Sequence, residues 1–294
     1  MKPSRLLTAS AAFAAFVLVT SSPTLSGAAS RSVRQRPKSV SYGPKLGTVV
    51  TKTFSSTIAG GTVVKITADG NVVGFASPKT LDHIAAGDIV EGYVLCYTNP
   101  KTAMAVNAYD VAFAASGFKA STHVASPYSV TRTTTDGVLR LKQAFVFNGL
   151  ERSLQITMTL TNLSGQTVTN IRLRRQVDFD ADAGGSSGTG SFTNLFGATT
   201  SGSVFAYNDS GGSLSLAPGD HGMLLRFLNG KAGTKLYGPT SGSATSSIYD
   251  SACSPGIDPT PDGPLDLGAT QNFLVPVTLT AGQVLTETIE YESI

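Results

Sequence analysis

The amino-acid sequence predicts an all-β protein, a large antiparallel β-sandwich or supersandwich. Its 294 residues include 31 Gly and no Trp, and only 14% of them are charged. Short apolar stretches recur after residue 42 and are separated by Gly, Asn, Asp and Pro, the punctuation of a strand-rich chain. Apolar and polar residues alternate within the clearest stretches, which is the period of a half-buried strand. These three observations favour a sheet protein over a helical one.

The turn residues divide the chain into a series of expected strands and one short helical stretch at 78–86. The run from Leu154 to Leu160 alternates most regularly, and a turn at Asn162 to Gly165 follows it. We therefore expect 152–163 and 167–180 to form an antiparallel hairpin. The other expected strands are 46–54, 62–67, 71–76, 89–98, 103–114, 128–134, 138–147, 203–208, 222–228, 271–279 and 283–292.

The N-terminal residues have the pattern of an export signal. Basic Lys2 and Arg5 precede an apolar run that ends at Thr20, and small residues follow as far as Ala29. The apolar run is too short to span a bilayer comfortably, although an uncleaved anchor is the alternative. We expect a signal peptide at 1–29, a flexible basic lead at 30–41 and a β-sandwich domain at 42–294. The mature chain would then be secreted, extracellular or associated with the cell surface, without a membrane span.

Charge is distributed unevenly between the two halves of the chain. Residues 39–175 hold 13 basic and 7 acidic residues, whereas residues 176–294 hold 3 basic and 12 acidic ones. Either the two halves attract each other within one fold, or the acidic half binds cations. The folded part has neither a strong basic surplus nor a motif of aromatic and basic residues, so nucleic acid is not an expected partner.

One arginine falls among apolar residues in an expected strand. Alternation places Arg175 on the otherwise apolar face of 171–179, where a guanidinium is costly to bury without an acid. Glu287 falls similarly between two apolar residues of its own strand. The sequence therefore predicts a buried ion pair of Arg175 with Glu287, unless a bulge after Arg174 turns the arginine outward.

Three alternate aspartates predict a calcium site. Asp178, Asp180 and Asp182 precede a Gly-rich loop, and carboxylate oxygens are the ligands that Ca²⁺ prefers. The spacing departs from the EF-hand loop, because Ala183 and Thr189 stand where that loop has a glycine and a bidentate acid. A solvated acidic turn is the alternative.

The two cysteines, Cys96 and Cys253, could form a disulfide. Export would permit the bond, whereas two thiols so far apart in sequence could also fail to meet. One cysteine at each location does not support a thiolate metal site.

No catalytic signature is convincing. Residues 184–188 match G-x-S-x-G, but no helix is expected after them, and the three histidines have no metal-ligand spacing. We therefore predict no catalytic residue and identify no ligand-binding set.

A strand motif resembles one known group of proteins. The chain has an Asn-rich turn and then a strand of the form RRxxDxD; the matching residues are Asn162, Leu163, Ser164, Gly165, Arg174, Arg175, Asp178, Phe179 and Asp180. This pattern resembles uncharacterised exported bacterial β-sandwich proteins, which usually have Trp at the position of Phe179. The group has no established activity, so the resemblance implies the fold and export alone.

These observations predict an exported protein that is non-catalytic and has a binding or structural role. Its expected partner is an extracellular glycan or a cell-surface protein. The alternative is a carbohydrate-active enzyme with paired Asp or Glu carboxylates, which requires two carboxyl groups about 5–10 Å apart in a cleft.

Overall fold

The computed structural model describes residues 49–84, 91–111, 114–178, 194–198, 203–208, 222–229, 236–240, 262–265, 268–272 and 277–294. Every regular element in these ranges is a β-strand, which confirms the predicted all-β fold class. The expected signal at 1–29 and lead at 30–41 lie outside the described residues and stay predictions. Within the described ranges, no helix is long and apolar enough to cross a membrane.

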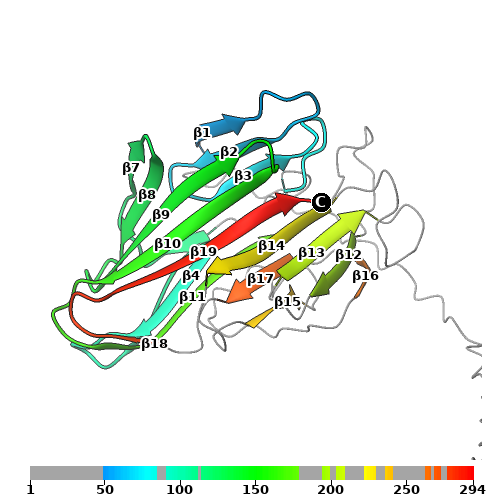
Figure 1. The fold of residues 1–294 in the computed structure, drawn as a ribbon. Coiled ribbons are helices and arrows are strands. Elements are labelled where there is room, and N and C mark those ends of the chain that lie inside the picture. The colour runs from blue at the N-terminus through cyan, green and yellow to red at the C-terminus, as the bar shows by residue number, and fades with distance from the viewer. Residues whose placement is uncertain are drawn as a thin grey trace, which may run out of the picture. The chain divides into compact units, whose positions relative to one another are not determined.

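The larger sheet has nine antiparallel strands. Their order across the sheet is β16 (Asp262–Leu265), β12 (Asn194–Ala198), β13 (Ser203–Asn208), β14 (Gly222–Asn229), β19 (Val284–Ser293), β10 (Ser153–Asn162), β9 (Leu139–Asn148), β8 (Tyr128–Thr133) and β7 (Thr122–Ala125). β19 comes last in sequence and lies between β10 and β14, in the middle of this sheet (Figure 1).

A seven-stranded sheet and a three-stranded sheet complete the fold. The former is ordered β15 (Leu236–Thr240), β17 (Gly268–Asn272), β11 (Val168–Asp178), β4 (Glu91–Thr98), β5 (Ala105–Val111) and β6 (Ala114–Ser116), with β18 (Val277–Leu279) beside β11. The latter contains β1 (Val50–Ser55), β2 (Val63–Thr67) and β3 (Val72–Ala76).

The core lies between the nine-stranded and seven-stranded sheets. Inward residues of β10, such as Ile156 and Leu160, share one buried cluster with Leu95 of β4 and Leu173 of β11. The alternation of β10 is visible in its burial, because every second side chain is fully buried and those between are partly exposed. The larger sheet therefore turns one apolar face inward and one polar face outward.

The predicted hairpin at Asn162 to Gly165 is wrong. β10 pairs with β9 and β19, whereas β11 pairs with β4, β17 and β18, so the turn carries the chain from one sheet to the other. The Asn162 amide donates hydrogen bonds to the carbonyls of Gln166 (2.7 Å) and Leu279 (2.9 Å), which fixes this arch to the β18–β19 connection. Apolar residues alternate along both strands, and this alternation is as compatible with two strands in facing sheets as it is with a hairpin.

The expected helical stretch at 78–86 is also wrong in its described part, 78–84, which forms turns and one isolated bridge. The Asp82 carboxylate accepts hydrogen bonds from the backbone N–H groups of Phe75 (3.1 Å) and Ile84 (3.0 Å). A side chain that binds nearby backbone donors in this way offers the chain an alternative to a helix.

Arg175 occupies the interior of the sandwich with three kinds of acceptor around it. Its side chain is fully buried; Nε donates to Glu91 Oε1 at 2.5 Å, a terminal nitrogen donates to the Gly70 carbonyl at 3.0 Å, and the other donates to Gln143 Oε1. These acceptors come from β4, β9 and the β2–β3 turn. One guanidinium therefore connects all three sheets.

Glu91 extends the same network. Besides Arg175, its carboxylate accepts a hydrogen bond from the Val72 N–H (2.8 Å) and one from the Tyr291 hydroxyl (2.8 Å). Burial acts to lower the pKa of Arg175, but the Glu91 carboxylate holds that pKa above its ordinary value. Burial and the same carboxylate hold the pKa of Tyr291 well above its ordinary value, so the hydroxyl keeps its proton.

The acid that pairs with Arg175 is therefore Glu91 and not the predicted Glu287. Arg175 faces inward as expected, and Glu287 is also buried. β4 neighbours β11, and Glu91 lies diagonally across from Arg175 on the same face. Tyr291 is the β19 residue that reaches this pair, whereas Glu287 lies about 13 Å farther along that strand.

A second buried ion pair anchors the β2–β3 turn. Arg132 contacts the buried Asp110 carboxylate and lies 3.5 Å from Asp69. The Tyr93 hydroxyl donates to the Asp69 carbonyl at 2.8 Å, and burial raises the pKa of Tyr93 to about 12. Gly70 has φ of +88°, and a Cβ there would lie 2.6 Å from the Gln143 amide, so this close approach requires glycine.

The β8–β9 turn is fixed by a single carboxylate. Asp136 accepts hydrogen bonds from the Thr134 hydroxyl (2.6 Å), the Val138 N–H (3.0 Å), the Tyr97 hydroxyl (2.7 Å) and the Asn99 amide (2.8 Å). Burial acts to raise the pKa of Asp136, but these donors outweigh it and hold the pKa below its ordinary value. The turn is thereby tied to β4 and the β4–β5 connection.

Arg175→Leu is expected to lower the free energy of unfolding by about 3–5 kcal/mol, because Glu91 would remain buried without its cation. The double variant with Glu91→Leu should lose less than the sum of the two single losses. Urea unfolding measures the difference, with Arg140→Leu on an exposed site as a control within about 0.5 kcal/mol of wild type. A loss below about 1 kcal/mol for Arg175→Leu would contradict this role.

Asp136→Asn is expected to lower the melting temperature at pH 7. The native pKa of Asp136 is below its unfolded value, so its stabilisation is present above about pH 4 and is lost as the pH falls through the native pKa. The gap between the two melting temperatures should therefore close in acid. A gap that stays constant from pH 7 to pH 2 would show that the charge has no such role.

Candidate functional site

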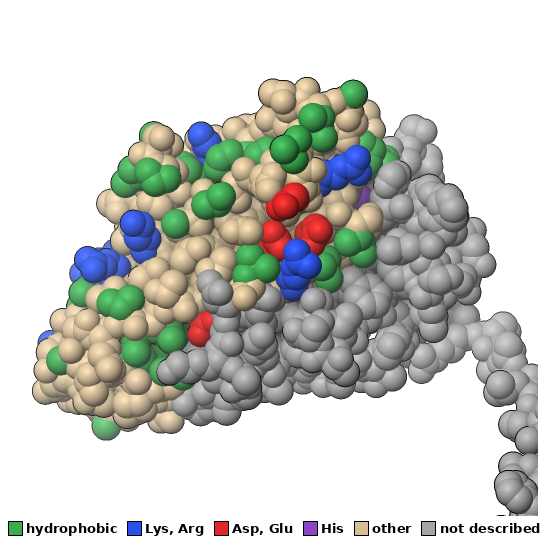
Figure 2. Space-filling model, in the orientation of Figure 1, with side chains coloured by type: hydrophobic (Ala, Val, Ile, Leu, Met, Phe, Trp, Pro, Cys, Tyr) green, Lys and Arg blue, Asp and Glu red, His purple; other side chains and the backbone are tan. Residues whose placement is uncertain are grey.

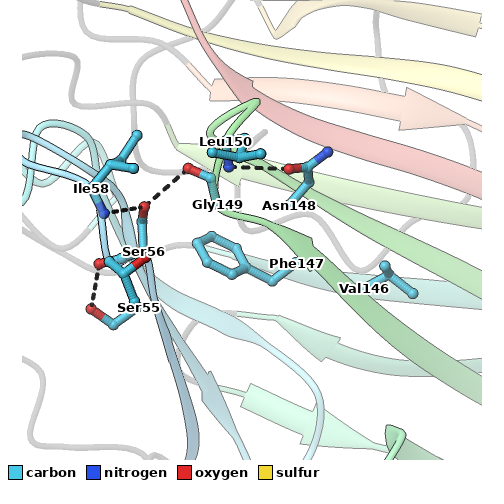
Figure 3. Close-up of a pocket in the computed structure, with 9 residues that line it drawn as sticks. Ser55, Ser56, Ile58, Val146, Phe147, Asn148, Gly149 and Leu150 are labelled. Atoms are coloured by element: carbon cyan, nitrogen blue, oxygen red, sulfur yellow. Dashed lines mark hydrogen bonds between the residues drawn. The ribbon is translucent and has the colours of Figure 1, made fainter.

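An open hollow of about 490 Å³ lies at the end of β9. Two segments form it, the end of β1 with the loop that follows and the end of β9 with the β9–β10 turn (Figure 3). Its lining residues are Ser55, Ser56, Thr57, Ile58, Val146, Phe147, Asn148, Gly149 and Leu150.

Hydrogen bonds hold these two segments together. The Ser56 hydroxyl donates to the Gly149 carbonyl (3.1 Å) and accepts a hydrogen bond from the Ile58 N–H (3.3 Å). In the turn, the Asn148 amide oxygen accepts hydrogen bonds from the N–H groups of Leu150 (3.1 Å) and Glu151 (3.2 Å). Figure 3 shows the bonds of Ser56 with Gly149 and Ile58 and the bond between Leu150 and Asn148. The opening is therefore preformed by local turn chemistry.

Apolar side chains stand at the mouth of the hollow. Leu150 is 79% exposed and Val146 is 58% exposed. Phe147 stacks against Phe54 of β1 with ring centroids 5.6 Å apart, which supports the floor. The hollow thus combines apolar and aromatic carbon surface with hydroxyl and amide groups, a combination typical of small-ligand sites.

Three carboxylates surround one guanidinium beside the hollow. One terminal nitrogen of Arg226 lies 2.6 Å from Glu290 and 2.7 Å from Glu292, and the Asn148 amide donates to Glu151 at 2.6 Å. Figure 2 shows acidic side chains gathered around a basic one over the outer face of the nine-stranded sheet. We call Glu151, Arg226, Glu290 and Glu292 the acidic cluster.

The members of the acidic cluster affect one another's protonation. Burial raises the pKa of Glu292, the Arg226 charge lowers it, and the charges of Glu290 and Glu151 raise it, with a net value above the ordinary one. Burial acts to lower the pKa of Arg226, but the hydrogen bond and charge of Glu290 raise it. Glu292 thus retains a proton to higher pH than an ordinary glutamate, which is a property of general acids.

The structure describes only parts of the predicted calcium and disulfide sites. Asp178 is the last residue of β11, paired with Gly268, while Asp180 and Asp182 lie outside the described residues. Cys96 lies in β4, and Cys253 is likewise outside those residues. Both sites stay predictions. Among the side chains that the structure describes, no group of three His, Cys, Asp or Glu could hold a metal ion.

Sequence reasoning did not find the acidic cluster or the hollow. The alternation of Glu290 and Glu292 with apolar residues does place both carboxylates on one face of β19. Their guanidinium, however, comes from β14, and only the pairing of β14 with β19 brings Arg226 opposite Glu290. No local pattern in the sequence predicts that β14 pairs with β19.

Arg226→Met is expected to raise the pKa of Glu292 further, because the guanidinium is the cation that lowers it. Carboxyl-detected NMR titration of wild type and variant measures the change. Arg140→Met, on the same sheet face but outside the cluster, is the matched control. An unchanged Glu292 titration in Arg226→Met would contradict the contact.

No family model and no curated protein matches this chain. Among solved structures, a bacterial glucoamylase in complex with acarbose is similar, with a TM-score of 0.52 and 11% identity over 89% of this chain. A polysaccharide lyase is similar with a TM-score of 0.47 and 11% identity over 80% of this chain. A galactose mutarotase related enzyme from Lactobacillus acidophilus is similar with a TM-score of 0.38 and 7% identity over 83% of this chain. The chain covers 35% of the glucoamylase, 33% of the lyase and 97% of the mutarotase related enzyme. The likeness to the glucoamylase is one of fold, that of a β-sandwich.

Proposed function

We propose that this protein is exported and acts as a non-catalytic binding protein for an extracellular glycan. The observation that carries the proposal is the hollow at the end of β9, where exposed Val146 and Leu150 and the Phe147 ring lie beside hydroxyl and amide groups. The N-terminal signal pattern and the RRxxDxD resemblance support export.

The chemistry of the hollow suits a sugar ring. A pyranose presents C–H groups on its faces and hydroxyls at its rim, so it needs apolar surface and hydrogen-bond partners side by side. Leu150 and Val146 offer the surface, while Ser55 and Asn148 offer hydroxyl and amide groups. Glu151 is hydrogen-bonded to Asn148 and supplies an acceptor next to the opening. The resemblance in fold to a glucoamylase crystallised with acarbose points to the same ligand class.

A carbohydrate-active enzyme is the second candidate, favoured by the acidic cluster. Glu290 and Glu292 contact the same Arg226 nitrogen and are therefore close together, and the pKa of Glu292 is raised. Paired carboxyl groups, one of them with a raised pKa, are what glycoside hydrolysis requires. Arg226 occupies the contact between these two carboxylates, which favours binding over hydrolysis.

Calorimetric titration of the exported chain with soluble polysaccharides and oligosaccharides tests the binding function. We expect Val146→Ser with Leu150→Ser to weaken glycan binding about tenfold, because the two side chains would lose apolar contact with the ligand. Val124→Ser is the matched control, since Val124 is 56% exposed on β7 and does not line the hollow. Equal affinity of all three proteins, or no heat with any glycan, would overturn the proposal.

Incubation with the same polysaccharides and oligosaccharides distinguishes a carbohydrate-active enzyme from a binding protein. Release of new reducing ends by wild type, lost in Glu292→Gln, would replace the binding function with an enzymatic one. Binding to cell envelopes that survives glycan removal but not protease treatment would instead identify a protein partner at the cell surface. Either result contradicts a non-catalytic glycan-binding role.

A further inference from the structure

The outer face of the nine-stranded sheet is a regular polar surface. Outward threonines of β8, β10 and β19 lie on it; they are Thr131, Thr133, Thr157, Thr159, Thr286 and Thr288. The hydroxyls of Thr157 and Thr288 are 3.1 Å apart, and those of Thr159 and Thr286 are 3.4 Å apart. We call this surface the threonine face. Its hydroxyls can each donate and accept a hydrogen bond, so it can pair with a polar surface of its own kind.

The two ends of the threonine face carry opposite charge. Toward one end, Arg140 and Lys142 project outward from β9, between the threonines of β8 and β10, and both are exposed. No ion pair of either is found among the residues that the structure describes. The acidic cluster lies at the other end, with three carboxylates around the Arg226 guanidinium. Figure 2 shows basic side chains toward the left of this face and acidic ones near the centre of the view.

The strand register fixes the separation of the two ends. Arg140 is opposite Thr161 of β10, whereas Glu290 is opposite Gln155 of the same strand. Six residues of extended chain span about 20 Å. This separation exceeds the Debye length of about 8 Å at physiological salt, so the two ends act as separate charges toward a partner.

We propose that the threonine face is the interface of a homodimer. Its two-fold axis lies in the plane of the interface, perpendicular to the line between the charged ends, and sets the basic end of one copy on the acidic end of the other. A surface with opposite charges at its two ends is its own complement under a two-fold rotation. A polyanion or a polycation would match one end and be repelled by the other. This inference goes beyond the glycan-binding function, because the partner is a second copy of the chain. The two surfaces meet at Glu151, which is hydrogen-bonded to Asn148 of the hollow, so the dimer is tested without glycan.

The threonine face has the size of a small interface. Five adjacent strands from β8 to β14, each about nine residues long, span roughly 700 Å² of sheet, although Thr288 and Glu290 on it are already buried within the protein. Weak interfaces bury less than about 1,200 Å² in total, or about 600 Å² on each side. The paired charges at both ends would set the orientation of the two copies, while the central hydroxyls fill the contact.

Sedimentation equilibrium at about 50 mM and about 500 mM NaCl tests the proposal. We expect a dimer whose dissociation constant rises about tenfold or more at the higher salt, because the interface depends on charge pairs. Two charge-reversed variants, Arg140→Glu with Lys142→Glu and Glu151→Lys with Glu292→Lys, should each be monomeric. An equimolar mixture of the two should dimerise again.

The control is Lys65→Glu with Lys101→Glu, which makes the same change in net charge at exposed positions outside the threonine face and should remain dimeric. Melting curves establish that each variant is folded, and Glu151→Lys alone replaces the second variant if Glu292→Lys unfolds the chain. A monomeric wild type at low salt, a dimer unaffected by either reversal, or a mixture that stays monomeric would each overturn the proposal.

Discussion

The contact between Arg175 and Glu91 is the constraint on which the arrangement of the three sheets depends. A guanidinium and a carboxylate lose their water when they are buried, and that loss is offset only if every donor and acceptor finds a partner. Here the partners are Gly70 and Val72 at the β2–β3 turn, Gln143 of β9 and Tyr291 of β19. A shift of any one sheet would leave charge unpaired in the core, so the network selects one arrangement among many that bury the same apolar area.

How far the sequence predicts this fold depends on the range of the interaction involved. The fold class and the inward position of Arg175 follow from alternation along single strands, which is a local property. The identity of the acid that pairs with Arg175 does not follow from alternation, because β4 is buried on both faces. Its residues therefore show no alternation from which the face of Glu91 could be predicted. The arch at Asn162 and the meeting of Arg226 with Glu290 also depend on pairing between distant strands. The hollow escaped prediction for the same reason, since its two sides come from β1 and β9.

The hollow and the threonine face both lie on parts of the β-sandwich that do not form its core. Side chains that point inward specify the fold, and the turns and outward faces are free to carry binding groups. Phe147 contributes to the core and to a binding surface, since its ring packs on the core and also lines the hollow. Glu290 is similar on the outer face, because Gln155 and Arg226 restrain a carboxylate that is almost wholly shielded from solvent. Rigid placement of such groups lowers the entropy that a ligand or partner would otherwise have to remove.

The central position of β19 in the larger sheet has a consequence for biosynthesis. Gln155 of β10 finds Glu290 of β19 as its neighbour only after 135 further residues have been made. Contacts so distant in sequence form slowly, because a long loop has to close before they are gained. The ribosome therefore has to make the whole segment between β10 and β19 before the middle of the nine-stranded sheet can pair. Until β19 is made, β10 and β14 have no strand between them, and the strands on either side of this gap cannot join into one sheet.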